Sequence, residues 1–450
     1  MAFLRTFPGG IHPPEEKHST AGRPVETLPV PDEIVLPMQQ HIGAPARPCV
    51  ARRDEVLRGQ VVGEPGGFVS AAVHATTSGT VKAVEPRPHP LRSTPALAVV
   101  IEPDGKDAWA PDCDRERSLE GLDATALRLI VQEAGIVGLG GATFPTHVKL
   151  SPPPDKPIDV AILNGVECEP FLTCDHAVML ETPDTIMAGF EIIMRVLGVR
   201  RGIIGIEANK PDAFEAMREA AQRLTGVETV MLPVKYPQGG EKQLIKALLD
   251  REVPPPPALP MDVGVVVHNV ATAQAIYEAV CLARPLTERV ITVTGPGVRR
   301  PGNYRVRIGA AMRHLAEHAG ANDRVGRLVV GGPMTGVAQS SLDAPVVKGT
   351  GGMLFLEAAA AYESRACIRC GRCVETCPVG INPSLLSVLL EDRRFDEAQQ
   401  ANLGSCIKCG VCAYVCPARR PIVHLIKLAD AELARRRAEE RARQTQKAAS

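Results

Sequence analysis

Apolar and polar positions along the chain follow two different periods, and the change between them divides the sequence into regions. In the first hundred or so residues, short stretches such as EVLRGQVVGEP and HATTSGTVKAVEP alternate apolar and polar side chains between Pro- and Gly-rich turns. Alternation with a period of two is typical of half-buried β-strands. The pattern therefore predicts a small β-rich domain over residues 1–117.

The pattern changes over residues 118–286, where longer apolar runs alternate with amphipathic segments. The runs VAILNGV, RGIIGIEA, TVMLPVK and VGVVVHNV predict strands, and PDAFEAMREAAQRL predicts a helix between two of them. Strands that alternate with helices form mostly parallel sheets covered by helices. We therefore expect an α/β domain in this region.

Two further regions have simpler patterns. Within residues 287–356, the stretch RRPGNYRV predicts a hairpin that turns through Pro301, Gly302 and Asn303, and no group of titratable residues accompanies it, which favours a spacer. The tail over residues 426–450 begins with helical spacing and then becomes highly charged, which predicts an exposed and partly disordered end. A basic membrane-surface helix is the alternative, and the glutamates of this tail disfavour it.

Two copies of one cysteine spacing lie near the end of the chain, in residues 357–425. Each copy has the form C-x2-C-x2-C-x3-C-P, with Gly371 or Gly410 between the second and third cysteines. Three thiolates at this spacing can surround one iron–sulfur cube, while the fourth cysteine reaches the other cluster. The repeat therefore predicts two [4Fe-4S] clusters with crossed ligand sets, which are Cys367, Cys370, Cys373 and Cys416 for the first, and Cys406, Cys409, Cys412 and Cys377 for the second.

Disulfides and zinc are the other interpretations of these cysteines. Disulfides need an oxidising compartment, and the opening MAFLRTFPGG has no apolar signal segment that would send the chain there. Zinc sites need only two C-x-x-C pairs, whereas both copies have a further cysteine and a following proline. The remaining cysteines show no ligand spacing and are expected to be buried thiols; they are Cys49, Cys113, Cys168, Cys174 and Cys281.

Composition excludes several classes of function. Lys plus Arg and Asp plus Glu both count 51 among the 450 residues, and aromatic residues make up 3%, so nucleic-acid binding is disfavoured. A bilayer span needs about 18 to 20 apolar residues in a row, and even the stretch DVGVVVHNVATAQAIYEAV is interrupted by polar side chains. We therefore expect a soluble or peripheral protein.

A glycine-rich loop opens the α/β region. In GIVGLGGATFPTHVKL, Gly138, Gly140 and Gly141 would let backbone amides approach a phosphate closely, and Lys149 would supply a matching positive charge. Clustered glycines are also common in ordinary turns, so the loop alone is a weak signal.

The loop and three later segments together resemble the flavin site of the complex I subunit that oxidises NADH. The segments NGVECEP, YPQGGEK and HNVAT follow the loop in the same order as in that family. The resemblance implies a non-covalent FMN held by Gly138, Gly140, Gly141, Lys149, Asn164, Glu167, Gly240, Glu241, Asn269 and Thr272, with Phe144 and Glu169 facing the nicotinamide nucleotide. The chain departs from the family at Thr143, Val166, Lys242 and His268, and Thr143 stands where the loop usually has another glycine.

The order of regions is similar to that of the RnfC family, whose members belong to the Rnf electron transport complex. The stretch GGIHPPEEK comes first, followed by a β-module that resembles a barrel-sandwich hybrid carrier domain without its modified lysine, the flavin loop, a segment that resembles a β-grasp (SLBB-like) module, and the paired cysteine motifs. The resemblance implies a multidomain α/β protein that ends in a two-cluster ferredoxin-like helical domain.

This resemblance also implies a function. It suggests a peripheral subunit on the cytoplasmic side of a bacterial inner membrane, an NADH-dependent oxidoreductase component of an ion-translocating complex. FMN and two [4Fe-4S] clusters would carry electrons between NADH and ferredoxin. Integral membrane and ferredoxin-like subunits would be its partners, with ferredoxin itself served indirectly. FMN accepts the hydride directly, so no catalytic side chain is predicted.

Two alternatives belong to other classes. The nearer is a soluble flavin and iron–sulfur reductase such as the cobalamin reductase of bacterial microcompartments. In that family the flavin loop lies near the N-terminus and the clusters precede the β-grasp segment, whereas here more than a hundred residues precede Gly138 and the clusters come last. The other alternative is an electron-carrier module that has lost nucleotide binding, which absence of flavin absorbance would favour.

Overall fold

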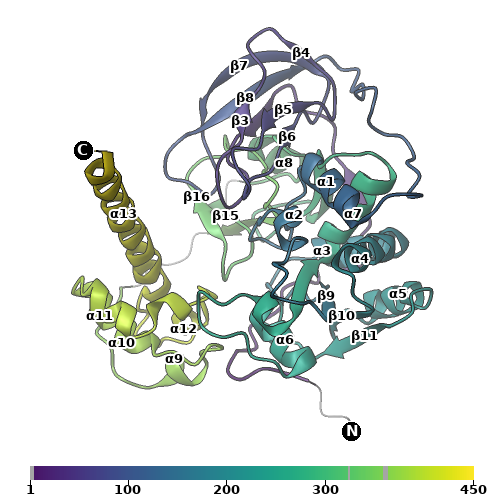
Figure 1. Ribbon diagram of the computed structural model, residues 1–450. Helices are drawn as coiled ribbons and strands as arrows, with labels where there is room; N and C mark the ends of the chain where they lie inside the picture. Colours follow the sequence, from purple (N-terminus) through teal and green to yellow (C-terminus); the bar gives the residue numbers. More distant parts are fainter. Residues whose placement is uncertain (1–4, 323–324, 358–362, 450) are drawn as a thin grey trace.

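The computed structural model describes residues 5–322, 325–357 and 363–449, which form four packed parts (Figure 1). The β-rich part lies at the top of Figure 1, the α/β part at the right, and the helical cysteine-rich part at the lower left. The third sheet, which corresponds to the predicted β-grasp region, lies between them.

Two small sheets form the N-terminal β-rich part, as its alternating pattern predicts. One sheet has the strand order β2-β8-β7-β4 and the other β3-β5-β6. Ile34, Leu36, Val99 and Ile101 are fully buried in the first sheet, on strands that pair antiparallel. The strands are β2 (Ile34–Pro37), β3 (Arg47–Pro48), β4 (Glu55–Val56), β5 (Val61–Glu64), β6 (Val73–His74), β7 (Gly79–Arg87) and β8 (Ala96–Pro103).

A parallel four-stranded sheet with the order β11-β10-β9-β12 is the centre of the α/β part. Its strands are β9 (Val160–Asn164), β10 (Arg201–Glu207), β11 (Val227–Leu232) and β12 (Val265–Asn269). The helices are α1 (Ala124–Glu133), α2 (Thr146–Lys149), α3 (Cys174–Glu181), α4 (Pro183–Leu197), α5 (Pro211–Ala221), α6 (Glu241–Leu249), the short 3-10 helix η1 (Pro260–Val263) and α7 (Val270–Cys281). All four predicted strands and the helix between β10 and β11 are confirmed.

A six-stranded mixed sheet with the order β1-β14-β13-β17-β15-β16 follows. The predicted hairpin is confirmed, because β13 and β14 pair antiparallel, but the position of its turn is wrong. Gly302 and Asn303 already belong to β14, where they pair with Val293 and Thr292, so the connection runs over residues 295–301. Strand β1 comes from the N-terminal region and adds to β14 in parallel. The elements are β1 (Val25–Thr27), β13 (Glu288–Thr294), β14 (Gly302–Arg307), α8 (Met312–His318), β15 (Val325–Val330), β16 (Val337–Gln339) and β17 (Gly352–Glu357).

The segment of residues 7–17, here called the N-terminal strap, joins parts that are far apart in sequence. Gly10 N donates to Thr376 O of the cysteine-rich part at 2.8 Å, and Ile11 forms a backbone bridge with Tyr236 of the α/β part. At the end of the strap, the buried ammonium of Lys17 donates to the carbonyl oxygens of Glu167 and Glu169, both at 2.9 Å, and to that of Leu172. The strap therefore binds the α/β part to the cysteine-rich part.

The cysteine-rich part is helical and has its own hydrophobic core, in which α10 packs on α13 around Leu386 and Ile426. Its elements are α9 (Arg372–Glu375), α10 (Pro383–Glu391), α11 (Phe395–Gln400), η2 (Leu403–Ser405), α12 (Val411–Tyr414) and α13 (Ile422–Ala449).

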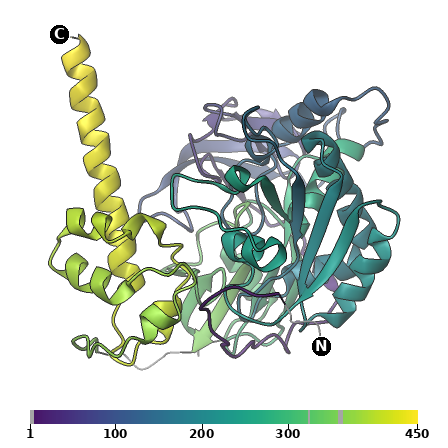
Figure 2. The same cartoon turned by 60° about the horizontal axis from the view of Figure 1, so that its bottom comes forward.

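Helix α13 projects away from the rest of the molecule (Figure 2). The predicted exposure of the tail is confirmed for residues 437–444, but the predicted partial disorder is wrong, because one helix continues to Ala449. Buried Ile422 and Ile426 anchor its start, and the Ala, Arg and Glu residues that follow are good helix formers. No helix among the described residues is both long enough and apolar enough to cross a membrane.

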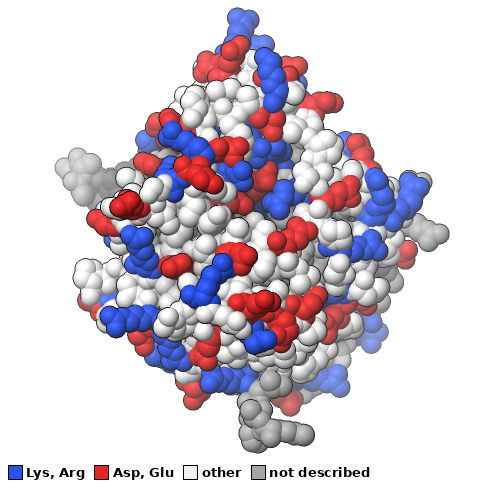
Figure 3. Space-filling model, turned by 90° about the vertical axis from the view of Figure 1, so that its right-hand side faces the viewer, with Lys and Arg blue, Asp and Glu red and all other residues white. Residues whose placement is uncertain are grey.

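Charges of both signs are intermixed on the face of the molecule shown in Figure 3. No large area of this face carries one sign alone, in keeping with equal numbers of acidic and basic residues in the sequence. This face therefore shows none of the single-sign character of a nucleic-acid-binding surface.

Candidate functional site

Two asparagines mark the carboxyl edge of the parallel sheet. Asn164 is the last residue of β9 and Asn269 the last of β12, and the two are direct partners in the strand register. Ligands of open α/β sheets bind outside the carboxyl ends of the strands. Asn269 also caps α7, because its side-chain oxygen accepts from Ala271 N at 2.9 Å and Thr272 N at 3.3 Å.

The glycine loop lies over this edge. Gly138 N donates to Phe144 O at 2.9 Å and closes the loop, and Leu139 N donates to Thr272 Oγ1 at 2.9 Å. A Cβ atom at Gly140 would lie 3.3 Å from Asn269 Cβ, whereas one at Gly141 would meet nothing within 4 Å. The loop is thus fixed on one side and has an open backbone on the other, as a phosphate or ribityl group requires.

Lys149 lies at the end of α2 and reaches both the sheet edge and α6. Its ammonium donates to Glu241 Oε1 and to Val267 O, both at 2.6 Å. Gly240 is the N-cap residue of α6, and Glu241 is its first residue. The predicted phosphate partner therefore already has an acidic neighbour, so a bound phosphate would compete with Glu241 for Lys149.

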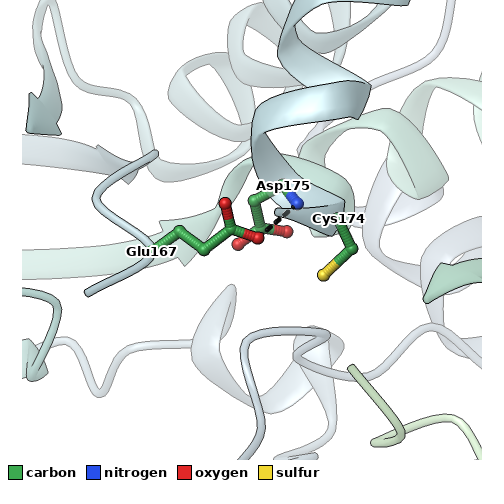
Figure 4. Close-up of side chains that lie close together, drawn as sticks. All are labelled: Glu167, Cys174 and Asp175. Carbon is green, nitrogen blue, oxygen red and sulfur yellow. Dashed lines mark hydrogen bonds between the residues drawn. The ribbon is translucent and has the colours of Figure 1, made fainter. Parts of the chain in front are cut away.

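Glu167, Cys174 and Asp175 lie close together at the start of α3 (Figure 4). The carboxylate of Glu167 accepts from Asp175 N at 2.7 Å and His176 N at 3.2 Å, which binds it to the start of α3. Asp175 Oδ2 accepts from Asn269 Nδ2 at 2.6 Å. Burial raises the pKa of Asp175 to about 7 and raises that of the Cys174 thiol as well. Through Asp175, these side chains thus hold the Asn269 amide in place beside the loop.

Thr143 departs from the family pattern and has a backbone φ of +50°, a conformation that is unfavourable for a β-branched residue. Its side chain is buried, and a Cβ at Gly349 would lie only 2.4 Å from Thr143 Cγ2. The absence of a side chain at Gly349 therefore leaves the space that Thr143 fills.

The two residues expected to face the nicotinamide nucleotide differ in their surroundings. Phe144 is half-buried within the loop. The carboxylate of Glu169 instead accepts from Met334 N at 3.2 Å, from Thr335 N at 3.0 Å and from the Thr335 hydroxyl, all in the turn between β15 and β16. Glu169 therefore anchors the third sheet, and its role in nucleotide recognition stays a prediction.

The eight repeated cysteines border two separate cavities. One is bordered by Cys367, Cys370, Cys373 and Cys416, and the other by Cys406, Cys409, Cys412 and Cys377. The structure thus brings together the same two sets of four that the repeat predicts, with the fourth cysteine exchanged between the runs. Sets of four converging sulfurs fit [4Fe-4S] clusters.

Both cysteine runs have the same backbone path. Arg369 and Lys408, at equivalent positions, have φ values of +54° and +56°, and Gly371 and Gly410 have values of +77° and +84°. Burial raises the pKa of the Cys409 and Cys412 thiols to about 12. These thiols are therefore protonated at neutral pH unless a metal displaces the proton.

Comparisons with known proteins agree with these sites. Family models match in four regions, described as the RnfC barrel sandwich hybrid domain over residues 5–106, the Nuo51 FMN-binding domain over 131–278, the SLBB domain over 290–338 and the 4Fe-4S dicluster domain over 359–417.

Relatives match almost the whole chain. The corresponding component of the proton-translocating ferredoxin:NAD(+) oxidoreductase complex of Clostridium ljungdahlii is 48% identical over 434 residues, which cover 96% of this chain and 94% of the relative. The chain belongs to the RnfC family of ion-translocating ferredoxin:NAD(+) oxidoreductase complexes. The RnfC-family component of the Na(+)-translocating complex of Acetobacterium woodii is 46% identical over 431 residues, which cover 95% of this chain and 97% of the relative.

The predicted membership of the RnfC family, the four-part fold and the FMN and iron–sulfur cofactors are therefore confirmed. A solved structure of an NAD+-reducing [NiFe]-hydrogenase in the H2-reduced state has a similar fold, with a TM-score of 0.50 and 20% identity, covering 71% of this chain and 67% of that one.

Sequence reasoning missed several residues of this RnfC-family site. Buried Arg289 comes from β13, in the region interpreted as a spacer, and donates to Leu139 O of the glycine loop at 3.3 Å and to Lys348 O. Asp175 and Lys17 were also missed. The five other cysteines were expected to be buried, and Cys174 is, whereas Cys49 is exposed and the other three are intermediate.

Proposed function

We propose that this RnfC-family chain is the electron-entry subunit of its complex, with FMN at the glycine loop and the two cysteine sets as cluster ligands. The chain would transfer electrons between NADH and a ferredoxin-dependent partner, one at a time through the clusters. The observation that carries the proposal is a direct connection between the flavin site and one cysteine cavity.

Residues 236–243, here called the bridging segment, make this connection. On one side, Asn164 Nδ2 donates to Gly239 O at 3.0 Å, and Gly240 and Glu241 belong to the candidate flavin pocket. On the other side, the Tyr236 hydroxyl donates to Cys409 O at 2.7 Å and Gln243 Nε2 donates to Pro378 O at 3.2 Å. One short segment therefore contacts both sites.

This contact supports an order for the two clusters. Cys409 and Pro378 border the cavity of the second run, so that cavity lies against the α/β part. The first run has exposed residues at positions 368–372. We infer that the second-run cluster exchanges electrons with the flavin and the first-run cluster with the partner.

The residues of the flavin site would bind and position the cofactor. FMN supplies the exchange between a two-electron hydride donor and one-electron acceptors. The loop amides and Lys149 would bind its phosphate, Asn164 and Asn269 would form the sheet-edge wall, and Asp175 would hold the Asn269 amide in place.

The comparisons support a place for this chain in an assembly of several subunits. They do not identify the other subunits. We propose a peripheral position on the cytoplasmic side of a bacterial inner membrane, with integral membrane and ferredoxin-like subunits as partners. The two relatives named for proton and Na(+) translocation are 48% and 46% identical to this chain, so similarity does not select an ion. We assign ion translocation itself to the partner subunits.

The direct test uses the purified chain, reconstituted anaerobically with FMN, iron and sulfide. We expect NADH to reduce a small one-electron acceptor with no other subunit present, because the chain supplies sites for both kinds of redox centre. Absorbance of NADH and of the acceptor measures the rate. Protein that binds flavin and iron yet fails to oxidise NADH would contradict the proposal.

A second prediction concerns Arg420, whose buried guanidinium borders the first-run cavity. It donates to Ser387 Oγ at 3.2 Å and pairs with Glu391. One charge at roughly 10 Å is worth about 1.7 kcal/mol at an effective dielectric constant of about 20, or about 70 mV for one electron. We therefore expect Arg420→Leu to lower the potential of the first-run cluster by several tens of millivolts.

A redox titration followed by electron paramagnetic resonance (EPR) measures both clusters in the same sample. The second-run cluster should keep its potential, since Arg420 does not border its cavity. Arg420→Lys keeps the charge and serves as the control, with a smaller shift expected. Equal shifts of both clusters, or none, would contradict the assignment of Arg420 to the first-run cluster.

A further inference from the structure

The two cysteine runs have equivalent residues in opposite environments. A Cβ at Gly410 of the second run would lie 2.6 Å from Met334 O, so the third sheet covers this glycine closely. At Gly371, the equivalent residue of the first run, a Cβ would meet nothing within 4 Å. The surface over the first run is therefore open where the equivalent surface of the second run is covered.

The residues beside these glycines differ in the same way. Val411 of the second run is fully buried against Ile11 and Tyr236, whereas its equivalent in the first run is Arg372, which is exposed. Ile368 is 66% exposed, while its equivalent Ile407 is only partly so. The second run thus packs against other parts of the chain. The first run instead exposes charged Arg372 and apolar Ile368 on the surface.

Three arginines on this surface have no acidic partner in the part of the chain that the structure describes. Exposed Arg365, Arg369 and Arg372 form no ion pair among the described residues, whereas Lys408, the equivalent of Arg369, pairs with Asp430 at 2.5 Å. Glu363 and Glu375 are the acidic residues nearest in sequence, and they flank the arginines on the outside. The three arginines thus lie within five residues of exposed Cys370 in sequence, and no acidic side chain in the described part of the chain pairs with them.

We propose that Arg365, Arg369 and Arg372 form the docking surface through which the first-run cluster meets an acidic iron–sulfur protein or domain. This inference rests on the proposed function, because it takes the first-run cluster as the exit. One electron passes from this cluster to one cluster of the partner, no bond forms or breaks, and NADH supplies the electron. Unpaired surface charges at such a contact accelerate association and make it depend on salt.

The test measures binding of a small, acidic two-cluster ferredoxin to the cluster-loaded chain without NADH, so its outcome is separate from that of the NADH assay. In Arg369→Glu/Arg372→Glu we expect binding at low ionic strength to weaken about tenfold or more. Salt should weaken binding to the native chain and have little effect on the variant.

The matched control is Arg52→Glu/Arg92→Glu, which makes the same change in net charge on exposed residues of the N-terminal β-rich part. Iron content and EPR spectra of both variants should equal those of the native chain, which excludes damage to the clusters. A milder pair, Arg369→Gln/Arg372→Gln, should give an intermediate loss.

Equal binding by the native chain and the Arg369→Glu/Arg372→Glu variant would overturn the proposal, as would equal weakening by the control. Vesicles with anionic lipid headgroups form a separate arm. If the arginine variants lost vesicle binding and kept ferredoxin binding, the surface would be a membrane contact, and the acidic protein partner would be rejected.

Discussion

Replacing Cys377 with alanine is expected to destroy the cluster of the other cysteine run. Cys377 lies in the first run in sequence, yet it borders the cavity of Cys406, Cys409 and Cys412. The intact chain should hold about eight irons, and the variant about four. Iron analysis together with EPR of the reduced protein measures the loss.

The second-run cavity lies against the α/β part, so loss of its cluster should interrupt electron transfer from the flavin site. With the second-run cluster gone, NADH should no longer reduce the remaining first-run cluster at the native rate, while dithionite still should. Cys416→Ala is the matched variant, because Cys416 borders the first-run cavity. In that variant NADH should still reduce the second-run cluster. If Cys377→Ala removed the first-run cluster instead, the crossed ligand sets would be wrong.

The second large effect is expected from Gly140→Leu. A Cβ at Gly140 would already lie 3.3 Å from Asn269 Cβ, so the rest of a leucine side chain would displace either the loop or the asparagine. We expect flavin affinity to fall by about 5- to 150-fold, since an overpacked site loses about 1–3 kcal/mol. NADH oxidation should fall with it.

Flavin fluorescence after gentle purification measures the bound cofactor, and EPR shows whether the clusters remain. Both clusters should stay intact, because the cysteine-rich part has its own core. Gly67→Leu is the control, since Gly67 is exposed and a Cβ there would meet only Ala44 Cβ, at 3.8 Å. Full flavin content in Gly140→Leu would place the cofactor away from this loop.

Local patterns in the sequence predicted much of the fold and both cysteine sets. Three of the four parallel strands, β9, β10 and β12, contain continuous apolar runs, and such runs identify buried strands without knowledge of the rest of the chain. The cysteine repeat was equally informative, because ligand spacing within a run reflects the shape of the cluster that it surrounds. Neither inference needed contacts between distant residues.

The missed residues act over long distances in sequence. Lys17 meets Leu172 across 155 residues, and Arg289 meets Leu139 across 150. A lone lysine or arginine has no periodic signal that reveals such a partner. The predicted disorder of the tail was wrong for a different, local reason, because buried Ile422 and Ile426 start a helix that the charged residues then continue.

The N-terminal strap also affects how this chain is made. Gly10 bonds to Thr376, which leaves the ribosome 366 residues after it. At about 5 to 20 residues per second, the strap waits roughly 20 to 70 seconds for this partner. The cysteine-rich part must therefore be synthesised before the strap can complete its contacts, so a segment made early reaches its final position late.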